Sequence, residues 1–436
     1  MTLISTRPLS TDLPGLFELP GGLRNSIASP VARRLFHAAA SRLDVTVEIE
    51  TGPGRREVLG RGGPSMRVHR PAEFYARIGR DGLIGFGEAY LTGAWDTDEP
   101  VGLGDFLTVL AAEMATLIPD RLQRLRALVV AKRPRFHKPD ERRSRNLIAH
   151  HYDLSNDLFQ LFLDPTMSYS SALFEADAES RPMLPPPGED AGLEEAQGRK
   201  IERLLDVTGV GDGSRVLEIG TGWGELALRA ARRGAHVHSI TLSTEQLELA
   251  RQRVAEAGFA DQVEIELCDY RAVTTAHPAR RYDAVLSVEM IEAVGAEYWA
   301  SYFRTIDSVL APGGRAGIQA ITMPHDRMLA TRGGFTWINK YIFPGGFLPS
   351  TDVIEQVTRD HTSLRVSDRL DFGQHYAETL RQWDNRFLAA RDQVLDLGFD
   401  EVFVRMWHFY LEYSRAGFAS GYLDVNQIVL DRGAQK

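Results

Sequence analysis

Closely spaced glycines directly after an apolar run give the clearest chemical signal in this chain. Residues 215–224 read Arg-Val-Leu-Glu-Ile-Gly-Thr-Gly-Trp-Gly, which predicts a buried strand that breaks into a turn at Gly220 and Gly222. A nucleoside cofactor can lie against the main chain only where no Cβ intervenes, so glycines suit a close ligand contact. A dinucleotide-binding turn would need a further glycine where Glu225 stands, and a carboxylate there would meet the pyrophosphate. The turn therefore disfavours NAD.

The residues that follow this turn predict the sheet that would position it. Alternating periods predict strands at 215–219, 235–240, 263–267, 284–288 and 314–320, with helices at 225–233, 244–257 and 298–310. Parallel strands with right-handed crossovers bring their carboxyl ends to one crevice, where ligands bind. The turn resembles the loop that holds S-adenosylmethionine. We expect this cofactor to contact Gly220, Gly222, Thr241, Ser243, Gln246, Asp269 and Tyr270.

Several of these residues have a second interpretation. Ser243 and Gln246 fit a capping box that satisfies free amides at a helix start, and capping and cofactor contact can coexist. Asp269 and Tyr270 could bond and stack on an adenine, or be a turn carboxylate and a half-buried tyrosine. Cys268 suits a small buried hydrophobe better than a nucleophile, because no adjacent cation would lower its thiol pKa.

Composition restricts the class of protein. The chain has 436 residues, 43% hydrophobic and 25% charged, enough for two domains. The single cysteine excludes an internal disulfide, and no apolar run is long enough for a membrane span, so we expect a cytoplasmic protein. The net charge of −9 argues against a nucleic-acid partner, yet residues 121–145 hold ten Lys and Arg. That segment predicts either a solvated linker or peripheral association with anionic membranes.

The chain is predicted to divide near residue 145. Before that point, residues 44–50 alternate as a strand does, residues 60–63 indicate a turn, and residues 72–78 and 103–115 indicate helices. The predicted fold is therefore α/β, with a smaller N-terminal α+β domain at residues 1–145 and a Rossmann-like class I methyltransferase sheet within residues 146–436.

Several long motifs resemble one enzyme family. Residues 150–157 read His-His-Tyr-Asp-Leu-Ser-Asn-Asp, residues 161–164 read Leu-Phe-Leu-Asp, and residues 167–172 read Met-Ser-Tyr-Ser-Ser-Ala. With further matches at 218–224, 268–271, 289–295, 337–349 and 372–383, the chain from Asn146 onward closely resembles the cyclopropane-fatty-acyl-phospholipid synthase family. Residues 85–95 resemble the membrane-side domain of the bacterial phospholipid synthases. The resemblance adds Tyr169 and Ser170 to the expected cofactor contacts.

The resemblance implies methyl transfer from S-adenosylmethionine to the double bond of an unsaturated phospholipid in the membrane. The resulting carbocation loses a proton to a bound bicarbonate in this family. By motif, the bicarbonate site corresponds to Ser171, Glu292, Gln319, Ile321 and Tyr376. The family has cysteine and histidine where this chain has Ser171 and Gln319, which alters how an anion would be held. We expect Glu292 to position the anion, with Tyr376 as its neighbour.

The carbocation can be converted to a neutral product by two routes. Direct proton loss from the added methyl closes a cyclopropane, whereas a hydride shift before proton loss leaves a 10-methylene group, the precursor of a methyl-branched chain. The sequence does not decide between these two products. It is also compatible with a homodimer and with a reductase partner that acts on a methylene product.

Three other classes of function are compatible with parts of the sequence. The first is a non-catalytic lipid-binding protein with a degenerate methyltransferase domain, which the intact glycines disfavour. The second is a methyltransferase on another substrate, such as a small molecule or tRNA, which would not need the motifs at 151–171. The third is a metal enzyme. We predict no metal, because neither the pair His150 and His151 nor the pair His236 and His238 has a convincing set of ligand companions in the sequence.

Overall fold

The computed structural model describes residues 13, 15–98, 102–113, 155–177, 182–183 and 192–432. The chain forms two compact units, each built from segments that are distant in sequence. Unit 1 takes Met1–Pro134, Gly333–Ile342 and Leu380–Tyr422, and unit 2 takes Arg135–Arg332, Phe343–Thr379 and Leu423–Lys436. The predicted boundary near residue 145, the basic segment 121–145 and the motif at 150–154 lie outside the described residues. They stay predictions.

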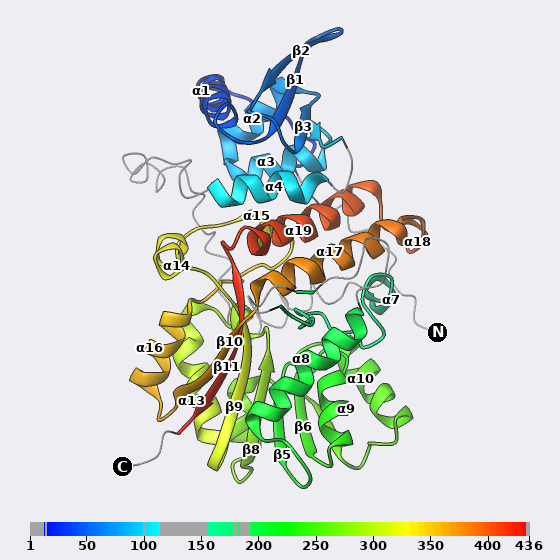
Figure 1. Cartoon of the computed structure of the whole chain (residues 1–436), viewed down its shortest axis with the longest axis vertical. Helices are drawn as coiled ribbons and strands as arrows, with labels where there is room; N and C mark the ends of the chain where they lie inside the picture. The colour runs from blue at the N-terminus through cyan, green and yellow to red at the C-terminus, as the bar shows by residue number, and fades with distance from the viewer. Residues whose placement is uncertain are drawn as a thin grey trace. The chain divides into compact units, whose positions relative to one another are not determined.

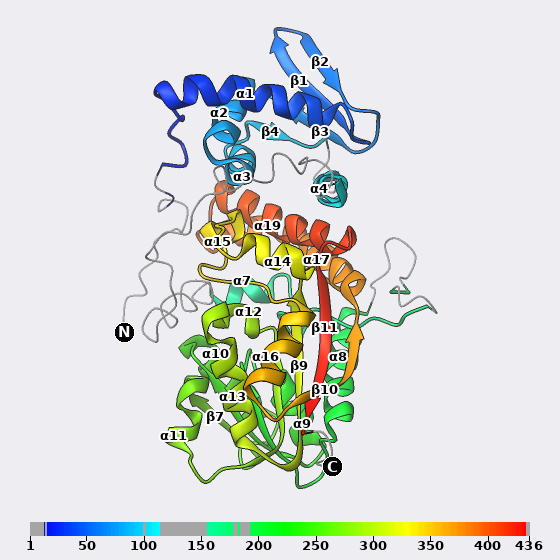
Figure 2. The same cartoon turned by 90° about the vertical axis from the view of Figure 1, so that its left-hand side faces the viewer.

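The N-terminal part of unit 1 is α+β, with a four-stranded sheet in the order β2-β1-β3-β4. β1 buries Val47 and Ile49 on one face, as the predicted alternation requires, and it pairs antiparallel with β2 and parallel with β3. Helix α1 lies alongside α2 (Figures 1 and 2). The elements are α1 (Leu23–Ala40), β1 (Thr46–Gly52), β2 (Arg55–Leu59), β3 (Ser65–Val68), α2 (Pro71–Asp81), α3 (Leu83–Leu91), β4 (Trp95–Asp96) and α4 (Gly102–Glu113).

The later segments of unit 1 pack on this first part. They contain α15 (Trp337–Tyr341), the end of α17 (Gly373–Ala389), α18 (Arg391–Asp396) and α19 (Glu401–Ala419), and α19 packs against α4. The Glu88 carboxylate, 1% exposed on α3, accepts a 2.9 Å hydrogen bond from the Tyr341 hydroxyl and pairs with Lys340. These contacts join residues 333–342 to the N-terminal segment, because a buried Glu88 carboxylate that lost its partners would destabilise the fold.

Unit 2 is built on a seven-stranded sheet in the order β10-β11-β9-β8-β5-β6-β7. The five strands from β9 to β7 in this order pair in parallel, which confirms the predicted α/β sheet. β11 joins them antiparallel and carries β10 at the edge. The strands are β5 (Arg215–Ile219), β6 (His236–Thr241), β7 (Val263–Leu267), β8 (Tyr282–Val288), β9 (Leu310–Thr322), β10 (Arg365–Asp371) and β11 (Asp424–Asp431).

Two apolar cores cover the two faces of this sheet. One core joins the sheet to α8, α9 and α10, and the other joins it to α11, α13 and α16 (Figure 1). The helices of unit 2 are α7 (Asn156–Gln160), α8 (Leu193–Thr208), α9 (Glu225–Arg232), α10 (Thr244–Glu256), α11 (Val273–Ala276), α12 (Ile291–Val294), α13 (Trp299–Val309), α14 (His325–Thr331) and α16 (Thr351–His361), with short 3₁₀ turns η3 (Tyr270–Ala272) and η4 (Ala296–Tyr298). Both faces are thus occupied, as a parallel sheet requires.

The sequence analysis did not predict β10 or β11. β10 reads Arg-Val-Ser-Asp-Arg-Leu-Asp and is mostly exposed, and β11 begins with Asp-Val-Asn-Gln, so neither shows a continuous apolar run. β11 forms its ladder with β9, and β10 forms its ladder with β11, so tertiary pairing rather than local composition stabilises both strands. Within the part of the chain that is described, no helix has both the length and the apolar character needed to cross a bilayer.

Candidate functional site

A cavity opens where the parallel strands of unit 2 end. β5 finishes at Ile219, and the following turn runs through Gly220 and Gly222 with φ of 98° and 52° before α9 begins at Glu225. Positive φ is a conformation that glycine adopts without a steric penalty. Seven of the predicted cofactor contacts line this cavity: Tyr169, Ser170, Gly220, Gly222, Thr241, Gln246 and Tyr270.

The shape of the turn fits a bound nucleoside cofactor. A Cβ built on Gly222 meets no protein atom within 4 Å, so a side chain there would project into open cavity. A Cβ on Gly220 would instead come within 2.6 Å of the Met290 side chain. Gly220 is therefore needed for packing against Met290, and Gly222 leaves the cavity open for a ligand. The site suits S-adenosylmethionine in this respect.

Replacing Gly222 by valine is expected to weaken S-adenosylmethionine binding by about tenfold or more, equivalent to about 1.4 kcal/mol. The branched side chain would occupy the space that a ligand needs. Isothermal titration calorimetry on the purified chain measures this directly. Gly258→Val is the matched control, because Gly258 also has positive φ and open surroundings but does not line the cavity. Equal losses in both variants would attribute the effect to backbone strain rather than to the ligand.

Polar groups around the turn can hold the amino-acid and ribose parts of a cofactor. Glu218, at the end of β5, is 3% exposed and lines the cavity, and its burial raises its pKa to about 8 although Ser239 donates to it at 2.5 Å. The Thr241 hydroxyl donates to the Gln246 side-chain oxygen at 3.0 Å, which orients both toward the cavity. Glu218 was not among the predicted contacts, although its place before the glycine turn was a usable signal.

Two predicted cofactor contacts are placed differently. Ser243 accepts a hydrogen bond from the Gln246 amide and so caps α10, but it is not among the residues that line the cavity. The Asp269 carboxylate accepts from the Arg271 main chain and guanidinium at 2.6–2.9 Å and caps η3. Cofactor contacts by Ser243 and Asp269 stay predictions. Cys268 is a buried thiol that hydrogen-bonds the Asp269 carbonyl at 3.4 Å.

A buried lysine lies on the opposite wall of the cavity. Lys200 on α8 is 2% exposed, and its ammonium donates to the Ser170 hydroxyl at 2.7 Å. Burial lowers its pKa to about 8, against the attraction of Glu289 and Asp164. A cation here partly compensates the carboxyl groups of the cavity. The sequence analysis missed Lys200, because a lysine within a helical pattern carries no separate signal.

The centre of the polar network is Glu289, directly after β8. Its Oε1 accepts from the Ser171 amide at 2.9 Å and from the Gln319 side chain at 2.8 Å, and its Oε2 accepts from the Tyr376 hydroxyl at 2.7 Å. Burial raises the pKa of Glu289, and these three hydrogen bonds together with Lys200 oppose the rise. Glu289 lines the cavity. A carboxylate held by three donors can accept a proton from a neighbouring group.

The amide of Gln319 has its orientation set by residues far from it in sequence. Arg203 can only donate, and it donates to the Gln427 side-chain oxygen at 2.8 Å. The Gln427 nitrogen must then donate to the Gln319 oxygen, at 3.1 Å, so the Gln319 nitrogen points to Glu289. β11, which the sequence analysis did not predict, thus supplies the residue that aligns this donor.

Glu292 makes a different set of contacts. Its Oε1 accepts from the Ile321 amide at 2.5 Å, and its Oε2 is a buried oxygen for which no hydrogen-bond partner is found in the described residues. Burial and the nearby Glu289 raise the pKa of Glu292 to about 8. Two enclosed carboxyls cannot both ionise cheaply, and the charge of Glu289 is one cause of the raised pKa of Glu292, so we expect Glu292 to be the carboxyl that holds a proton.

The five residues predicted to hold a bicarbonate come together only in part. Ser171, Gln319 and Tyr376 direct donors to Glu289, and the Ser171 donor is its main-chain amide, since its hydroxyl donates to the Ala172 carbonyl. Of the other four residues of this predicted set, Ile321 is the one that hydrogen-bonds Glu292, through its main-chain amide. The acceptor that these donors share is therefore a carboxylate of the chain itself.

Backbone strain marks the same place. Glu289 and Met167 have φ of 53° and 57° and are the two non-glycine residues with positive φ in the described ranges, and both line the cavity. This conformation costs a non-glycine residue of order 1 kcal/mol or more and persists where surrounding contacts enforce it. The Glu289 amide donates to the Gln319 carbonyl at 2.8 Å, which holds the strained residue beside β9.

Comparison with known proteins gives consistent results. The profile described as mycolic acid cyclopropane synthetase matches residues 139–428. The tuberculostearic acid methyltransferase UfaA1 of Mycobacterium tuberculosis is 52% identical, covering 96% of this chain and 95% of its own. The cyclopropane-fatty-acyl-phospholipid synthase of Escherichia coli K12 is 32% identical, covering 87% and 93%. The crystal structure of mycolic acid cyclopropane synthase CmaA1 with SAH and CTAB superposes with a TM-score of 0.57 at 29% identity, covering 66% of this chain and 97% of that one.

Proposed function

Because the chain belongs to the mycolic acid cyclopropane synthetase family of S-adenosylmethionine-dependent methyltransferases, we propose that it methylates the double bond of an unsaturated phospholipid acyl chain. We further propose that the product is the 10-methylene chain, the precursor of a methyl-branched acyl group. The name of the relative that is 52% identical over nearly the whole chain supports a methyl-branched product. The phospholipid is supported by the name of the Escherichia coli relative, which also spans both units.

Glu289 is the observation that carries the proposed mechanism. When bound, S-adenosylmethionine supplies an electrophilic methyl group. Methyl addition leaves positive charge on the acyl chain, and a hydride shift moves that charge to the carbon that bears the new methyl. The Glu289 carboxylate stabilises the charge and then removes a proton from the methyl, giving the exocyclic double bond. Ser171, Gln319 and Tyr376 hold the base in place, so no separate bicarbonate is required.

Analysis of the lipid product tests this assignment. The chain would be expressed in cells rich in oleoyl phospholipids, and the extracted acyl chains examined by mass spectrometry and proton NMR. We expect a mass gain of one methylene unit together with vinylidene proton signals. Cyclopropane proton signals in place of the vinylidene signals would overturn the product assignment. An unchanged acyl profile, with the protein shown to be folded and able to bind S-adenosylmethionine, would overturn the acyl substrate.

We also propose peripheral association with anionic membranes. Besides the basic segment 121–145, helix α1 presents exposed apolar side chains at helical spacing, since Ile27, Val31 and Leu35 are 72%, 49% and 59% exposed. The helix has three arginines and no acidic residue. An apolar stripe with basic flanks is the pattern of a helix that lies in the membrane interface. A homodimer and a reductase partner stay predictions.

Introducing aspartates at Val31 and Leu35 together is expected to weaken binding to phosphatidylglycerol vesicles by about tenfold or more, because each removed side chain contributes about 1.5–3 kcal/mol when buried. Vesicle co-sedimentation measures the loss. Val58→Asp is the control, since Val58 is a comparably exposed valine on β2. If the double variant and the control bind alike, α1 does not contact lipid, and any salt-dependent binding would belong to segment 121–145.

A further inference from the structure

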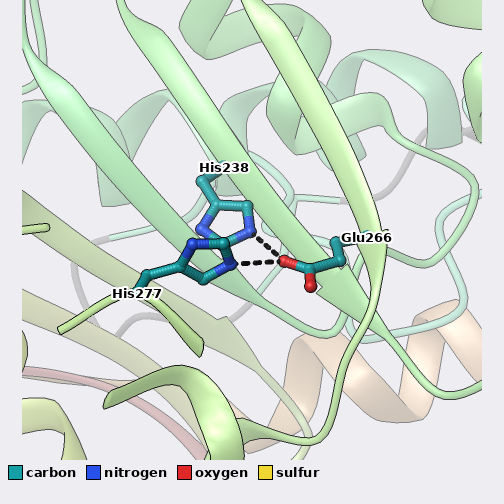
Figure 3. A group of neighbouring side chains, drawn as sticks. All are labelled: His238, Glu266 and His277. Carbon is teal, nitrogen blue, oxygen red and sulfur yellow. Dashed lines mark hydrogen bonds and ion pairs between the residues drawn. The ribbon is translucent and has the colours of Figure 1, made fainter. Parts of the chain in front are cut away.

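A second group of ligating side chains lies in unit 2, apart from the cofactor cavity. His238 comes from β6, Glu266 from β7 and His277 from the turn after α11, and the three side chains converge (Figure 3). None of them lines the cavity described above. In the sequence His238 had no ligand companions, and the fold brings two of them to it.

The geometry is close to that of a metal site. Glu266 Oε2 lies 2.9 Å from His238 Nε2 and 2.8 Å from His277 Nε2, and the ligating atoms of all three residues lie within 4.8 Å of one another. Zinc binds nitrogen and carboxylate oxygen at about 2.0–2.2 Å, which sets tetrahedral ligand atoms about 3.3 Å apart. Binding of an ion would therefore require the Glu266 oxygen to move a few tenths of an ångström away from each imidazole nitrogen, and the two imidazole nitrogens, which lie within 4.8 Å of each other, to adopt the same separation.

The surroundings of His238 favour its metal-binding form. Its Nδ1 lies 2.7 Å from the Tyr282 hydroxyl, so with an ion bound a proton on Nδ1 could be donated to that oxygen, and Nε2, which otherwise hydrogen-bonds Glu266, would have its lone pair for the ion. A hydrogen bond from the remote ring nitrogen is the usual means by which proteins orient a histidine ligand.

Charge and access are consistent with an ion. The Glu266 carboxyl faces both imidazoles, with its Oε2 at 2.9 Å from His238 Nε2 and at 2.8 Å from His277 Nε2. The His277 and Glu266 side chains are 19% and 34% exposed, which leaves a route from solvent and room for a water ligand. Glu264 on β7 is paired with Arg280 at 2.7 Å and leaves Glu266 as the carboxylate directed at both imidazoles.

We propose that His238, Glu266 and His277 bind a divalent zinc ion, with water at the fourth position. The ion would connect β6 to β7, the edge strand of the sheet, and to the turn after α11. β7 leads directly into Cys268 and Tyr270, which line the cofactor cavity. The ion would therefore stabilise the edge that carries this wall without contacting the cofactor.

The test uses the full chain without a polyhistidine tag, stripped with a chelator and titrated with zinc chloride by calorimetry and thermal unfolding. We expect stoichiometric binding and a raised melting temperature. His277→Ala and Glu266→Gln should each weaken binding by about tenfold or more, because each removes a ligand from a three-ligand site. Tyr282→Phe keeps all three ligands and should weaken binding by about 10-fold to 100-fold.

His361→Ala is the control, because it removes an exposed histidine at the end of α16 and leaves the cluster intact. It should bind zinc as the unsubstituted chain does. Circular dichroism and S-adenosylmethionine binding would show that each variant is folded. Absence of zinc binding by the folded chain would mean that Glu266 only pairs with two histidines. Binding that survives both His277→Ala and Glu266→Gln would place the ion elsewhere.

Discussion

Glu289→Gln is expected to lower the turnover of an oleoyl phospholipid by about 10³-fold or more, with little change in the affinity for S-adenosylmethionine. The substitution preserves the size of the side chain, but its amide has a single acceptor oxygen, so it can accept from Ser171 or from Tyr376 and not from both. It removes the negative charge that stabilises the carbocation and the oxygen that takes its proton. Loss of a base that acts only after binding should appear in kcat rather than in cofactor affinity.

Two comparisons make this prediction specific to Glu289. Glu297→Gln changes an exposed glutamate on the same connection and should leave turnover unchanged. Glu292→Gln keeps an acceptor for the Ile321 amide and replaces a group that is already protonated at neutral pH, so its effect should be much smaller. A larger loss in Glu292→Gln than in Glu289→Gln would instead favour a bicarbonate base positioned by Glu292, as the family resemblance implied.

The effect of bicarbonate on turnover distinguishes Glu289 as the base from a bound bicarbonate as the base. If Glu289 is the base, turnover in buffer depleted of carbon dioxide should equal turnover with added bicarbonate. The donors that would hold the anion already contact the Glu289 carboxylate. A strong activation of the unsubstituted enzyme by bicarbonate would contradict the proposed mechanism.

Tyr376→Phe is expected to lower turnover by about 10²-fold and to move the acid limb of the pH profile to higher pH. The Tyr376 hydroxyl donates to Glu289 at 2.7 Å, and this bond stabilises the ionised carboxylate and so lowers its pKa. Removing the bond raises that pKa further. Because the ionised form is the active one, turnover then begins to fall at a higher pH as the solution is acidified.

The sign of this shift separates a positioning role from a structural one. In the unsubstituted enzyme the acid limb should already lie above the ordinary range of a glutamate, since burial raises the pKa of Glu289. Tyr302→Phe is a suitable control, because Tyr302 is a fully buried tyrosine of the same unit whose hydroxyl makes no hydrogen bond to Glu289 among the described residues. A uniform loss of turnover in Tyr376→Phe with an unshifted profile would show that Tyr376 only supports the fold.

The sequence predicted the elements whose signals are local. The strand before Gly220 and the strand at 263–267 were predicted with the bounds that the structure has, and α9 and α10 were predicted to within one residue. These segments have a regular apolar period and clear turn residues, and such features depend only on neighbouring residues. For the same reason the sequence located the cavity, since the carboxyl ends of parallel strands necessarily meet at one edge.

The sequence could not assign partners within the site. Glu289 and Glu292 are three positions apart on one connection, and either could have received the donors. The choice is made by residues that lie 118, 30 and 87 positions from Glu289, namely Ser171, Gln319 and Tyr376. Gln427, which aligns Gln319, enters through an antiparallel strand without a clear apolar pattern.

The sequence by itself determined the family, the parallel sheet and the cavity at which we propose that the cofactor binds, because periodicity, glycine turns and long ordered motifs depend on the order of residues along the chain. Only the tertiary structure decided which carboxylate is held by three donors, which histidine has ligand companions, and which distant segments complete unit 1. The physical reason is the same in each case. Hydrogen bonds and burial act over a few ångströms in space, and strand pairing sets those distances between residues that sequence order keeps far apart.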